Sequence, residues 1–388
     1  MGRVRDVAVI GAGPAGLHAA CRLATSSLDV VLLEAQAQIG EHAICSGVIG
    51  EEAFARFDLP TSTVLAKIHC IQAISPQERK LTYETDTPLA RVVDKGEFNR
   101  TLGERVQGAG AEILLGHRVL SLEQEKHAVV LRLQSPENHP TTLRARVALI
   151  ASGVNGSFHR MLGLVRPRQL LRAVQADVAV SNGHEPAPTK VYVGQSVAPG
   201  AFGWEIPVGN GMTRVGLMTT CDPKPYFLKL LRRISPQVEE SEVCICQKAI
   251  AQAPHGRCAT DRVLVIGEAA GHVKTSTGGG IYYGLLSADF AAEVTLRAFR
   301  RGDFSAPALA DFERYWCREF GRELLVGYFA RQVAGGFTDN QIEKIFEAAN
   351  ATHLLAWLDG RLKFDWHQRA LLAALRGWVG LPSALGGG

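Results

Sequence analysis

The stretch VLVIGEAAGHVKTSTGGGIYYGLLS, residues 263–287, organises the rest of the chain. It predicts a short buried strand over 263–266, a turn at Gly267, a polar loop, and an apolar helix that opens on three glycines, Gly278, Gly279 and Gly280. Adjacent glycines at a helix start leave backbone N–H groups uncovered by side chains, which suits an anionic or oxygen-rich ligand. One such turn is a weak signal, so its value depends on whether the chain holds a matching element.

A matching element lies near the start of the chain. Residues 6–10, DVAVI, predict a buried strand, and GAGPAG at 11–16 predicts a turn that brings the backbone close to a pyrophosphate. Glu34 follows a second predicted strand about 20 residues later, where a carboxylate binds a ribose hydroxyl. The sequence therefore predicts a dinucleotide site, with contacts from Gly11, Gly13, Pro14, Ala15, Gly16, Glu34 and Ala35.

Composition limits the remaining function classes. The chain has 388 residues, 46% of them hydrophobic and 21% charged, as in an ordinary globular protein. A net charge of +4 with scattered basic residues argues against nucleic-acid binding. The first predicted strand begins almost at Met1 and no apolar run is long enough to cross a bilayer, so we expect a cytoplasmic protein or one peripheral to a membrane. The eight cysteines show no paired spacing with histidines, so no metal site is predicted.

The pattern along the chain predicts an α/β (α+β) architecture. Alternating apolar and polar residues predict an antiparallel sheet inserted into the nucleotide-binding fold, followed by helices at the C-terminus. The expected boundaries are 1–65, 95–165 and 255–300 for a discontinuous nucleotide-binding domain, 66–94 and 166–254 for the antiparallel-sheet domain, and 301–388 for the helical region.

Two segments are candidates for chemistry. The loop EHAICSGVIG, residues 41–50, follows the first nucleotide-binding unit, and the thiol of Cys45 is either part of a site or a small buried residue without chemistry. The segment APGAFGWEIP, residues 198–207, puts Phe202 and Trp204 on one face of a strand. These two rings predict either simple core packing or an aromatic wall beside an apolar substrate.

Several motifs together resemble known proteins. GAGPAG with Glu34, ASG at 151–153 and GEAAG at 267–271 resemble the FAD-containing family typified by p-hydroxybenzoate hydroxylase. Within it, the chain resembles the geranylgeranyl reductase branch in CSG at 45–47, in P-x-x-F-x-W-x-I-P at 199–207 and in GEAAGHVKTSTGGGIYYG at 267–284. FTDNQIEKIF and KFDW near the C-terminus are similar to that branch as well. Three positions depart from the pattern: Glu268 and Ser152 replace the usual Asp, and Phe202 replaces the more usual Tyr.

The resemblance implies a Rossmann-like FAD domain with an inserted substrate domain, and reduction of isolated C=C bonds in a polyprenyl chain on a lipid, a quinone or an isoprenoid. NAD(P)H or a ferredoxin is the implied electron donor, and peripheral membrane contact is implied by the lipid substrate. Further FAD contacts fall on Ser46, Gly47, Arg100, Ala151, Ser152, Gly153, Gly267, Glu268, Gly278, Gly279, Gly280 and Ile281, and substrate contacts on Phe202, Trp204, Pro207 and Tyr283.

The implied reaction requires a proton donor. An isolated alkene has no carbonyl to accept charge, so hydride transfer must be accompanied by protonation inside an apolar pocket. We expect Cys45 to be the catalytic residue, with His42 or His272 as a relay. Two other classes remain open: a flavin monooxygenase or halogenase of the same fold, and a non-catalytic protein that binds FAD or lipid. Halogenases of this fold commonly carry W-x-W-x-I-P, and the corresponding FGWEIP here lacks the first Trp.

Overall fold

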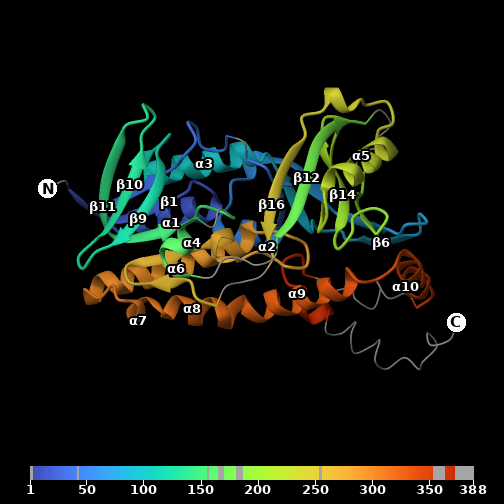
Figure 1. The fold of residues 1–388 in the computed structure, drawn as a ribbon. Helices are drawn as coiled ribbons and strands as arrows, with labels where there is room; N and C mark the ends of the chain where they lie inside the picture. Colours follow the sequence, from blue (N-terminus) through green and yellow to red (C-terminus); the bar gives the residue numbers. More distant parts are fainter. Residues whose placement is uncertain are drawn as a thin grey trace.

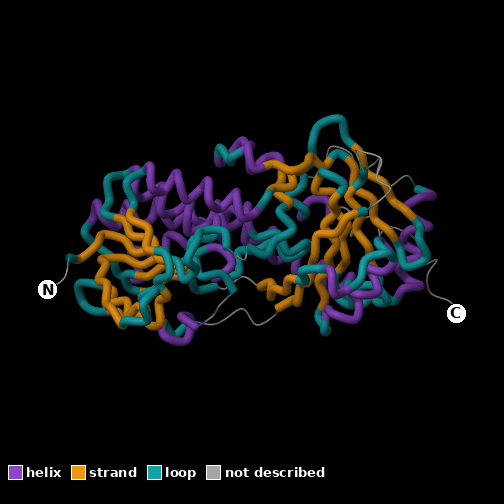
Figure 2. Tube along the Cα trace, turned by 90° about the horizontal axis from the view of Figure 1, so that it is seen from above, coloured by secondary structure: helices purple, strands orange, loops and turns teal. Residues whose placement is uncertain are grey.

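The computed structural model describes residues 3–41, 43–154, 157–164, 170–180, 187–252, 256–352 and 363–371. Figure 1 shows two sheet-containing lobes side by side, with the helices α7 to α10 running beneath both of them. Seen from above in Figure 2, the strands gather in two groups at opposite ends of the molecule, with loops between them. The predicted class, an α/β fold with an inserted sheet and a helical C-terminal region, is confirmed.

The first lobe contains a sheet in which the described residues form eight strands, with β1 (Val4–Ile10) at its centre. β1 pairs in parallel with β2 (Val30–Leu33) and β11 (Pro140–Ile150), and the sheet continues in parallel to β8 (Glu112–Leu114) and β18 (Val263–Val265). All four residues of β2 are buried, as expected for a strand covered on both faces. β9 (Arg118–Gln124) and β10 (Val129–Gln134) extend β11 as an antiparallel meander, and β17 (Ala259–Thr260) pairs with β18.

Three helices complete this lobe: α1 (Pro14–Thr25), α3 (Lys95–Gly108) and α6 (Ile281–Arg301). α1 lies between the other two and contacts both. α3 begins at Asp94, whose side chain accepts a hydrogen bond from the N–H of Glu97, and α6 ends at Gly302 in the left-handed conformation. The N-terminus of α6 faces the second lobe, because a Cβ on Gly278 would lie 3.2 Å from the sulfur of Met218.

The second lobe is built on a seven-stranded sheet with the order β16, β12, β15, β14, β13, β5, β6 among the described residues. The strands are β16 (Cys246–Ala251), β12 (Leu170–Ala179), β15 (Met212–Thr219), β14 (Phe202–Gly209), β13 (Thr189–Val193), β5 (Cys70–Ile74) and β6 (Lys80–Glu84). All pairs are antiparallel except β13 with β5, which is parallel. The prediction of an antiparallel sheet is therefore correct for every pair except β13 with β5. These two strands are far apart in the sequence.

Alternation along these strands divides the second sheet into two faces. Val174 and Leu217 belong to the cluster that packs under α5 (Pro223–Ile234), whereas Ala173 and Met218 belong to a cluster with Trp204 on the opposite face. We call the latter the inner face. Because side chains alternate in a strand, Gln175 of β12 and Arg214 and Gly216 of β15 share the inner face with Trp204.

A three-stranded sheet of β3 (Val48–Gly50), β7 (Ala90–Val93) and β4 (Val64–Ile68) connects the two lobes. The sequence places β4 and β7 with the second sheet, but both pair with each other and β7 also pairs with β3. The alternation of apolar and polar residues specifies which face of a strand is buried, but it does not specify the strand with which it pairs. Short elements complete this region: α2 (Glu51–Phe57), η1 (Thr61–Thr63), α4 (Ser157–Met161), η2 (Glu240–Glu242) and η3 (Gly267–Ala270).

The C-terminal region is helical, with α7 (Ala306–Leu309), α8 (Asp311–Trp316), α9 (Arg322–Ala334) and α10 (Asp339–Ala351). One π-helical turn at Cys317–Gly321 lies between α8 and α9. Residues 353–362 and 372–388 of the predicted helical region lie outside the described residues. Among the residues that the structure describes, no helix is both long and apolar enough to span a membrane.

Candidate functional site

The glycine turn after β1 has the shape that a pyrophosphate requires. Gly11 has φ +107°, and a Cβ there would lie 2.6 Å from the carbonyl oxygen of Ala151, so only glycine fits. A Cβ on Gly16 would collide with the carbonyl oxygen of Gly11. In contrast, nothing lies within 4 Å of the Cβ position of Gly13, which precedes Pro14 at the start of α1. The N-terminus of α1 is therefore open to an anion.

Glu34 stands at the end of β2 in the position that the sequence predicts for a ribose ligand. One carboxylate oxygen accepts the N–H of Ala12 at 2.7 Å and the other accepts the N–H of Gln36 at 2.9 Å. These hydrogen bonds fix the carboxylate beside the glycine turn, with Ala35 adjacent to it. Arg100, also predicted as a cofactor contact, lies on α3 and pairs with Glu97 at 2.7 Å, with 47% of its side chain exposed.

The second glycine segment converges on the first. A Cβ on Gly267, which has φ +62°, would lie 2.8 Å from the Cβ of Ala15 in α1. Gly153 has φ +68°, and the carboxylate of Glu268 lies 3.6 Å from its Cβ position. Residues from β11, α1 and η3 therefore meet at one place, and the replacement of Asp by Glu at 268 leaves a carboxylate there.

An FAD fits this arrangement on observations from the structure itself. The hydroxyl oxygen of Ser152 is buried and has no hydrogen-bond partner among the described residues. The backbone cradle at Gly13 would be filled by any Cβ, and the carboxylate of Glu34 is already oriented for a ribose. Ser152 and Glu34 would hold the ribityl and ribose hydroxyls, and the N-terminus of α1 the pyrophosphate.

The three glycines at 278–280 lead into α6, as predicted, with Ile281 as its first residue. The N–H of Gly278 donates to the carbonyl of Lys274 at 2.7 Å, and the carbonyl of Gly279 accepts the N–H of Lys274 at 2.8 Å. A Cβ on Gly278 would lie 3.2 Å from the sulfur of Met218 on the inner face. This loop therefore lies where the two lobes meet.

The loop CSG, residues 45–47, is held against the inner face by two side chains. The amide of Gln175 donates to the carbonyl of Cys45 at 3.0 Å, and Arg214 donates to the carbonyl of Ser46 at 2.8 Å. Gly47 has φ +75° and packs against the carbonyl of Val93, which excludes any side chain at this position. Cys45 is thereby fixed between the FAD domain and the second sheet.

Three cationic side chains interact electrostatically with Cys45, and no sequence motif indicates any of them. Burial lowers the pKa of Arg214, but the two hydrogen bonds that its guanidinium donates to the carboxylate of Asp177, at 2.7 Å each, more than offset this, so its pKa is raised. Burial likewise lowers the pKa of Lys248, and Glu268 at 2.8 Å raises it above the ordinary value. A thiolate at Cys45 would raise the pKa of both groups further.

The third cation is Lys95, the first residue of α3. Its ammonium donates to the side-chain carbonyl of Asn99 and lies 5.2 Å from the centre of the Phe98 ring. Burial lowers the pKa of Lys95 to about 8, while the charge of Cys45 acts to raise it and the charge of Lys248 acts to lower it. The positions of these cations could not be read from spacing, because β16, β15 and α3 are far apart in the chain.

The predicted aromatic wall is present on the inner face. The rings of Phe202 and Trp204 lie with centroids 6.2 Å apart at 66°, and the Trp204 ring lies 2.5 Å from the Cβ position of Gly216. The indole N–H of Trp204 is buried without a hydrogen-bond partner among the described residues. Pro207 lies on the opposite face from these two rings, because it is an odd number of residues from each of them.

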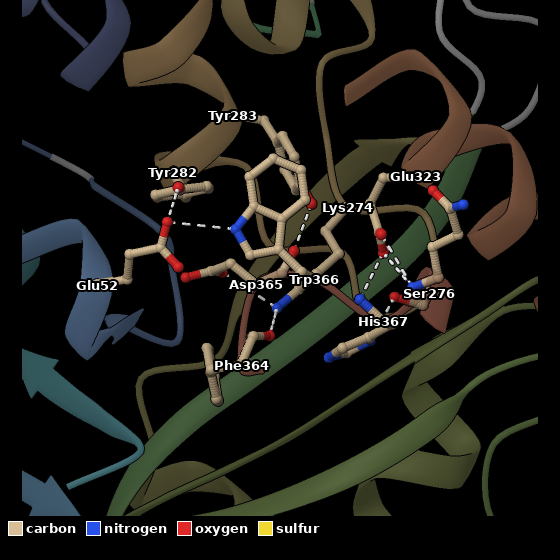
Figure 3. Close-up of polar contacts among 11 residues, drawn as sticks. Glu52, Lys274, Ser276, Tyr282, Tyr283, Glu323, Phe364, Asp365, Trp366 and His367 are labelled. Atoms are coloured by element: carbon tan, nitrogen blue, oxygen red, sulfur yellow. Dashed lines mark hydrogen bonds and ion pairs between the residues drawn. The ribbon is translucent and has the colours of Figure 1, made fainter. Parts of the chain in front are cut away.

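Tyr283, expected to contact substrate, is fully buried, and its hydroxyl donates to the backbone carbonyl of Asp365. Its neighbour Tyr282 donates to Glu52 at 2.5 Å. Figure 3 shows both tyrosines next to Trp366, which belongs to a segment near the C-terminus, residues 363–367, that we call the strap. The ring of Trp366 in the strap lies 5.8 Å from that of Tyr282 and 5.9 Å from that of Tyr283.

The strap is anchored by a buried ion pair. The ammonium of Lys274 lies 3.2 Å from the carboxylate of Asp365 and donates to the carbonyl of Phe364 at 2.6 Å (Figure 3). The Phe364 ring packs against the inner-face cluster that contains Trp204. The Trp366 ring packs against the core of the first lobe, so both rings of the strap pack inward.

Of the two histidines considered as a relay, the structure describes His272. His272 is fully buried, 2.8 Å from the hydroxyl of Ser287, and its ring contacts those of Phe312, Trp316 and Phe320. The His272 ring is therefore enclosed by side chains of the C-terminal region. His42 lies outside the described residues. In the part of the chain that the structure describes, no group of three or more His, Cys, Asp or Glu residues could hold a metal ion.

Comparisons with known proteins agree with this geometry. Residues 5–197 match the family model described as pyridine nucleotide-disulphide oxidoreductase. Digeranylgeranylglycerophospholipid reductase 2 of Methanopyrus kandleri is 28% identical over 377 residues, which cover 92% of this chain and 93% of that protein. The digeranylgeranylglycerophospholipid reductase of Methanospirillum hungatei is 27% identical, and the match covers 91% of each chain.

Solved structures show the same fold. A geranylgeranyl bacteriochlorophyll reductase-like protein from Thermoplasma acidophilum superposes with a TM-score of 0.85 at 22% identity, covering 96% of each chain. The p-nitrophenol 4-monooxygenase of Pseudomonas putida gives a TM-score of 0.70 at 16% identity, covering 92% of this chain and 97% of that one. A halogenase in complex with FAD gives 0.69 at 14% identity, covering 97% and 90%.

The fold and the site define an FAD-dependent oxidoreductase. Within that class the chain is similar, over about nine tenths of its length, to proteins named digeranylgeranylglycerophospholipid reductase.

Proposed function

We propose that the protein saturates isolated C=C bonds of a geranylgeranyl-type polyprenyl chain carried on a lipid, a quinone or another isoprenoid. The observation that carries this proposal is the likeness, over 92% of the chain, to a protein named digeranylgeranylglycerophospholipid reductase. The aromatic pair Phe202 and Trp204 supports it, because an apolar wall on the inner face suits a hydrocarbon chain.

When bound and reduced, FAD supplies a hydride. The residues of this chain have the other tasks: the turn at Gly11–Gly16 and Glu34 hold the cofactor, and the inner face orients the alkene and excludes water. Cys45 donates a proton to one alkene carbon while the other carbon accepts the hydride. Gln175 and Arg214 keep the loop of Cys45 in place during this step.

The alternative is a flavin-dependent monooxygenase or halogenase. The p-nitrophenol 4-monooxygenase and the FAD-bound halogenase share the fold over most of the chain, with lower TM-scores than the reductase-like protein. The segment FGWEIP, without a first Trp, favours the reductase over the halogenase.

We propose NAD(P)H or a ferredoxin as electron donor and a peripheral contact with the membrane that holds the lipid substrate. Leu325, Phe329 and Val333 form a stripe on α9 with four-residue spacing, and each side chain is more than half exposed. A Phe329→Ser variant should sediment less with lipid vesicles than the native protein, and unchanged sedimentation would remove this contact from the proposal.

The function is tested by anaerobic reoxidation. The FAD of the purified protein is reduced with dithionite, geranylgeranyl diphosphate or a geranylgeranylated lipid is added, and flavin absorbance is followed together with the product mass. Reoxidation without oxygen, with two hydrogens gained for each reduced bond, supports the reductase. A flavin that stays reduced until air is admitted, and then gives an oxygenated or halogenated product, supports the alternative.

Cys45→Ala separates proton donation from binding. It should retain FAD and bind substrate, but reduce the alkene roughly 10²-fold more slowly, which is the usual contribution of a positioned acid. An unchanged rate would assign the proton to another group.

A further inference from the structure

Lys95 is a buried cation with an uncharged hydrogen-bond partner. Only 9% of the residue is exposed, and its ammonium donates to the amide oxygen of Asn99. Buried ammonium groups are ordinarily paired with a carboxylate, because an isolated buried charge is costly. Among the described residues, no ion pair joins Lys95 to a carboxylate. The burial of Lys95 without a carboxylate therefore requires an explanation other than stability. The backbone brings Lys95 to Cys45, because β7 runs antiparallel to β3 and the N–H of Val93 donates to the carbonyl of Gly47 at 2.9 Å.

The other two cations around Cys45 differ from Lys95. Arg214 is held by both oxygens of Asp177, and Lys248 is held by Glu268. A guanidinium does not release its proton in proteins. The carboxylate of Glu268 raises the pKa of Lys248 above its ordinary value, which keeps that ammonium protonated. Lys95 is therefore the one cation of these three that can change its protonation state near neutral pH.

We propose that Lys95 is the proton source that restores the thiol of Cys45 after each reduction. This inference rests on the proposed function, in which Cys45 gives its S–H proton to the alkene. The S–H bond breaks, a C–H bond forms, and a thiolate remains at Cys45 while the hydride from the reduced cofactor completes the saturated carbon pair. The ammonium of Lys95 then transfers one proton to the thiolate, and the neutral amine recovers its proton from solvent.

The charges around Lys95 suit both the holding and the release of its proton. A thiolate at Cys45 attracts the ammonium of Lys95 and acts to raise its pKa, so the two charges form a pair for as long as the thiolate exists. Burial and the neighbouring charge of Lys248 act in the opposite direction and bring the pKa of Lys95 to about 8. The proton on Lys95 can therefore leave at the pH at which proteins ordinarily work.

The first test measures the proton on Cys45 without any substrate. Alkylation of Cys45 by iodoacetamide in the FAD-loaded protein is followed by peptide mass spectrometry across neutral and alkaline pH. Lys95→Met removes the nearby charge and should slow alkylation near neutral pH by roughly tenfold, equivalent to about one pH unit in the profile. Lys95→Arg keeps the charge and should leave the profile close to that of the native protein. Lys224→Met, on the exposed surface of α5, is the matched control.

The second test separates charge from proton transfer. Arginine at position 95 cannot release a proton, so Lys95→Arg should complete its first turnover, which uses the thiol already present, at nearly the native rate. Later turnovers should slow by about 10² or more. A small buffer amine should restore part of the steady-state rate in Lys95→Ala and have no effect on the native protein.

Two results would overturn the proposal. One is a steady-state rate of Lys95→Arg equal to that of the native protein, which would give Lys95 a role of charge alone. The other is an alkylation profile that Lys95→Met does not change. If the native protein reduces no prenyl substrate, the proposed function fails, and the alkylation profiles still decide whether Lys95 controls the protonation of Cys45. Retention of FAD by each variant shows that it has folded.

Discussion

Two buried lysines in this molecule have opposite surroundings. The side chain of Lys274 is 3% exposed and is neutralised by Asp365, with the carbonyl of Phe364 as a further acceptor. Lys95 is nearly as buried, but it meets the amide of Asn99 and lies near a second cation, Lys248. Lys274 joins the strap to the loop before the three glycines, whereas Lys95 lies beside the thiol that we propose as the acid.

The difference shows how burial of the same side chain serves structure in one place and chemistry in another. A buried lysine with a carboxylate keeps its charge and stabilises one arrangement of the chain. A buried lysine without one has a lowered pKa, because burial disfavours the charged form. The buried ammonium of Lys95 is therefore expected to lower the free energy of unfolding. The following variants test this contrast between Lys95 and Lys274.

The largest effect should follow from removing the carboxylate of the structural pair. Asp365→Ala leaves the ammonium of Lys274 buried without its partner, and should lower the free energy of unfolding by about 3–5 kcal/mol. Urea unfolding of the FAD-loaded protein, followed by circular dichroism, measures it. The double variant Lys274→Met, Asp365→Leu removes both charges and should recover most of the loss. A loss in Asp365→Ala below that of a typical surface substitution would mean that water replaces the carboxylate.

Lys95→Met should have the opposite sign. The pKa of Lys95 falls from 10.5 in the unfolded chain to about 8 in the folded protein, so between these values only the unfolded chain holds the proton. Native stability is therefore lost as the pH falls from 10.5 to 8, by roughly 3 kcal/mol in total, and stays low below 8. The variant should be more stable than the native protein at neutral pH, and the difference should shrink as the pH rises toward 10.5. A variant less stable at neutral pH would show that Lys95 is a structural residue.

Much of the cofactor site could be predicted from the sequence, because its signals are local. The glycines at 11, 13 and 16 and Glu34 lie within one strand–helix–strand unit, and the structure gives each of them the geometry that its residue type requires. The pairing of Phe202 with Trp204 follows from alternation within one strand. The same alternation places Pro207 on the opposite face of the strand from these two rings.

The rest depends on contacts between distant segments. Nothing in the spacing of the chain brings Lys95 and Lys248 to Cys45, because α3, β16 and the loop at 45–47 meet only when the lobes pack. The strap presented the same difficulty. Phe364 and Trp366 have the composition of an exposed apolar segment, and only the docking of Asp365 on Lys274 shows that they pack inward.

A smaller effect should come from His367, which lies next to the structural pair and 2.9 Å from the hydroxyl of Ser276. Burial, and then the charge of Lys274, lower the pKa of His367 to about 3 from 6.5. Only the unfolded chain is protonated between these values, so stability falls as the pH drops from 6.5 toward 3, by roughly 2 kcal/mol at pH 5. His367→Asn should reduce this acid-dependent loss. An identical pH dependence in the variant and the native protein would place the acid sensitivity elsewhere.

The smallest effect should come from Lys224, which pairs with Glu240 at 2.8 Å on the surface of the second lobe. Its distance to a carboxylate is shorter than that of Lys274 to Asp365, yet more than half of the Lys224 side chain is exposed. Water and salt screen such a pair, so Lys224→Met should leave the free energy of unfolding unchanged within error. This variant decides between two explanations of the comparison. If Lys224→Met were as damaging as Asp365→Ala, pairing with a carboxylate would matter regardless of exposure. If Lys224→Met has no effect, a lysine needs a carboxylate partner only when it is buried. Lys274 then depends on Asp365, and the lack of such a partner lowers the pKa of Lys95.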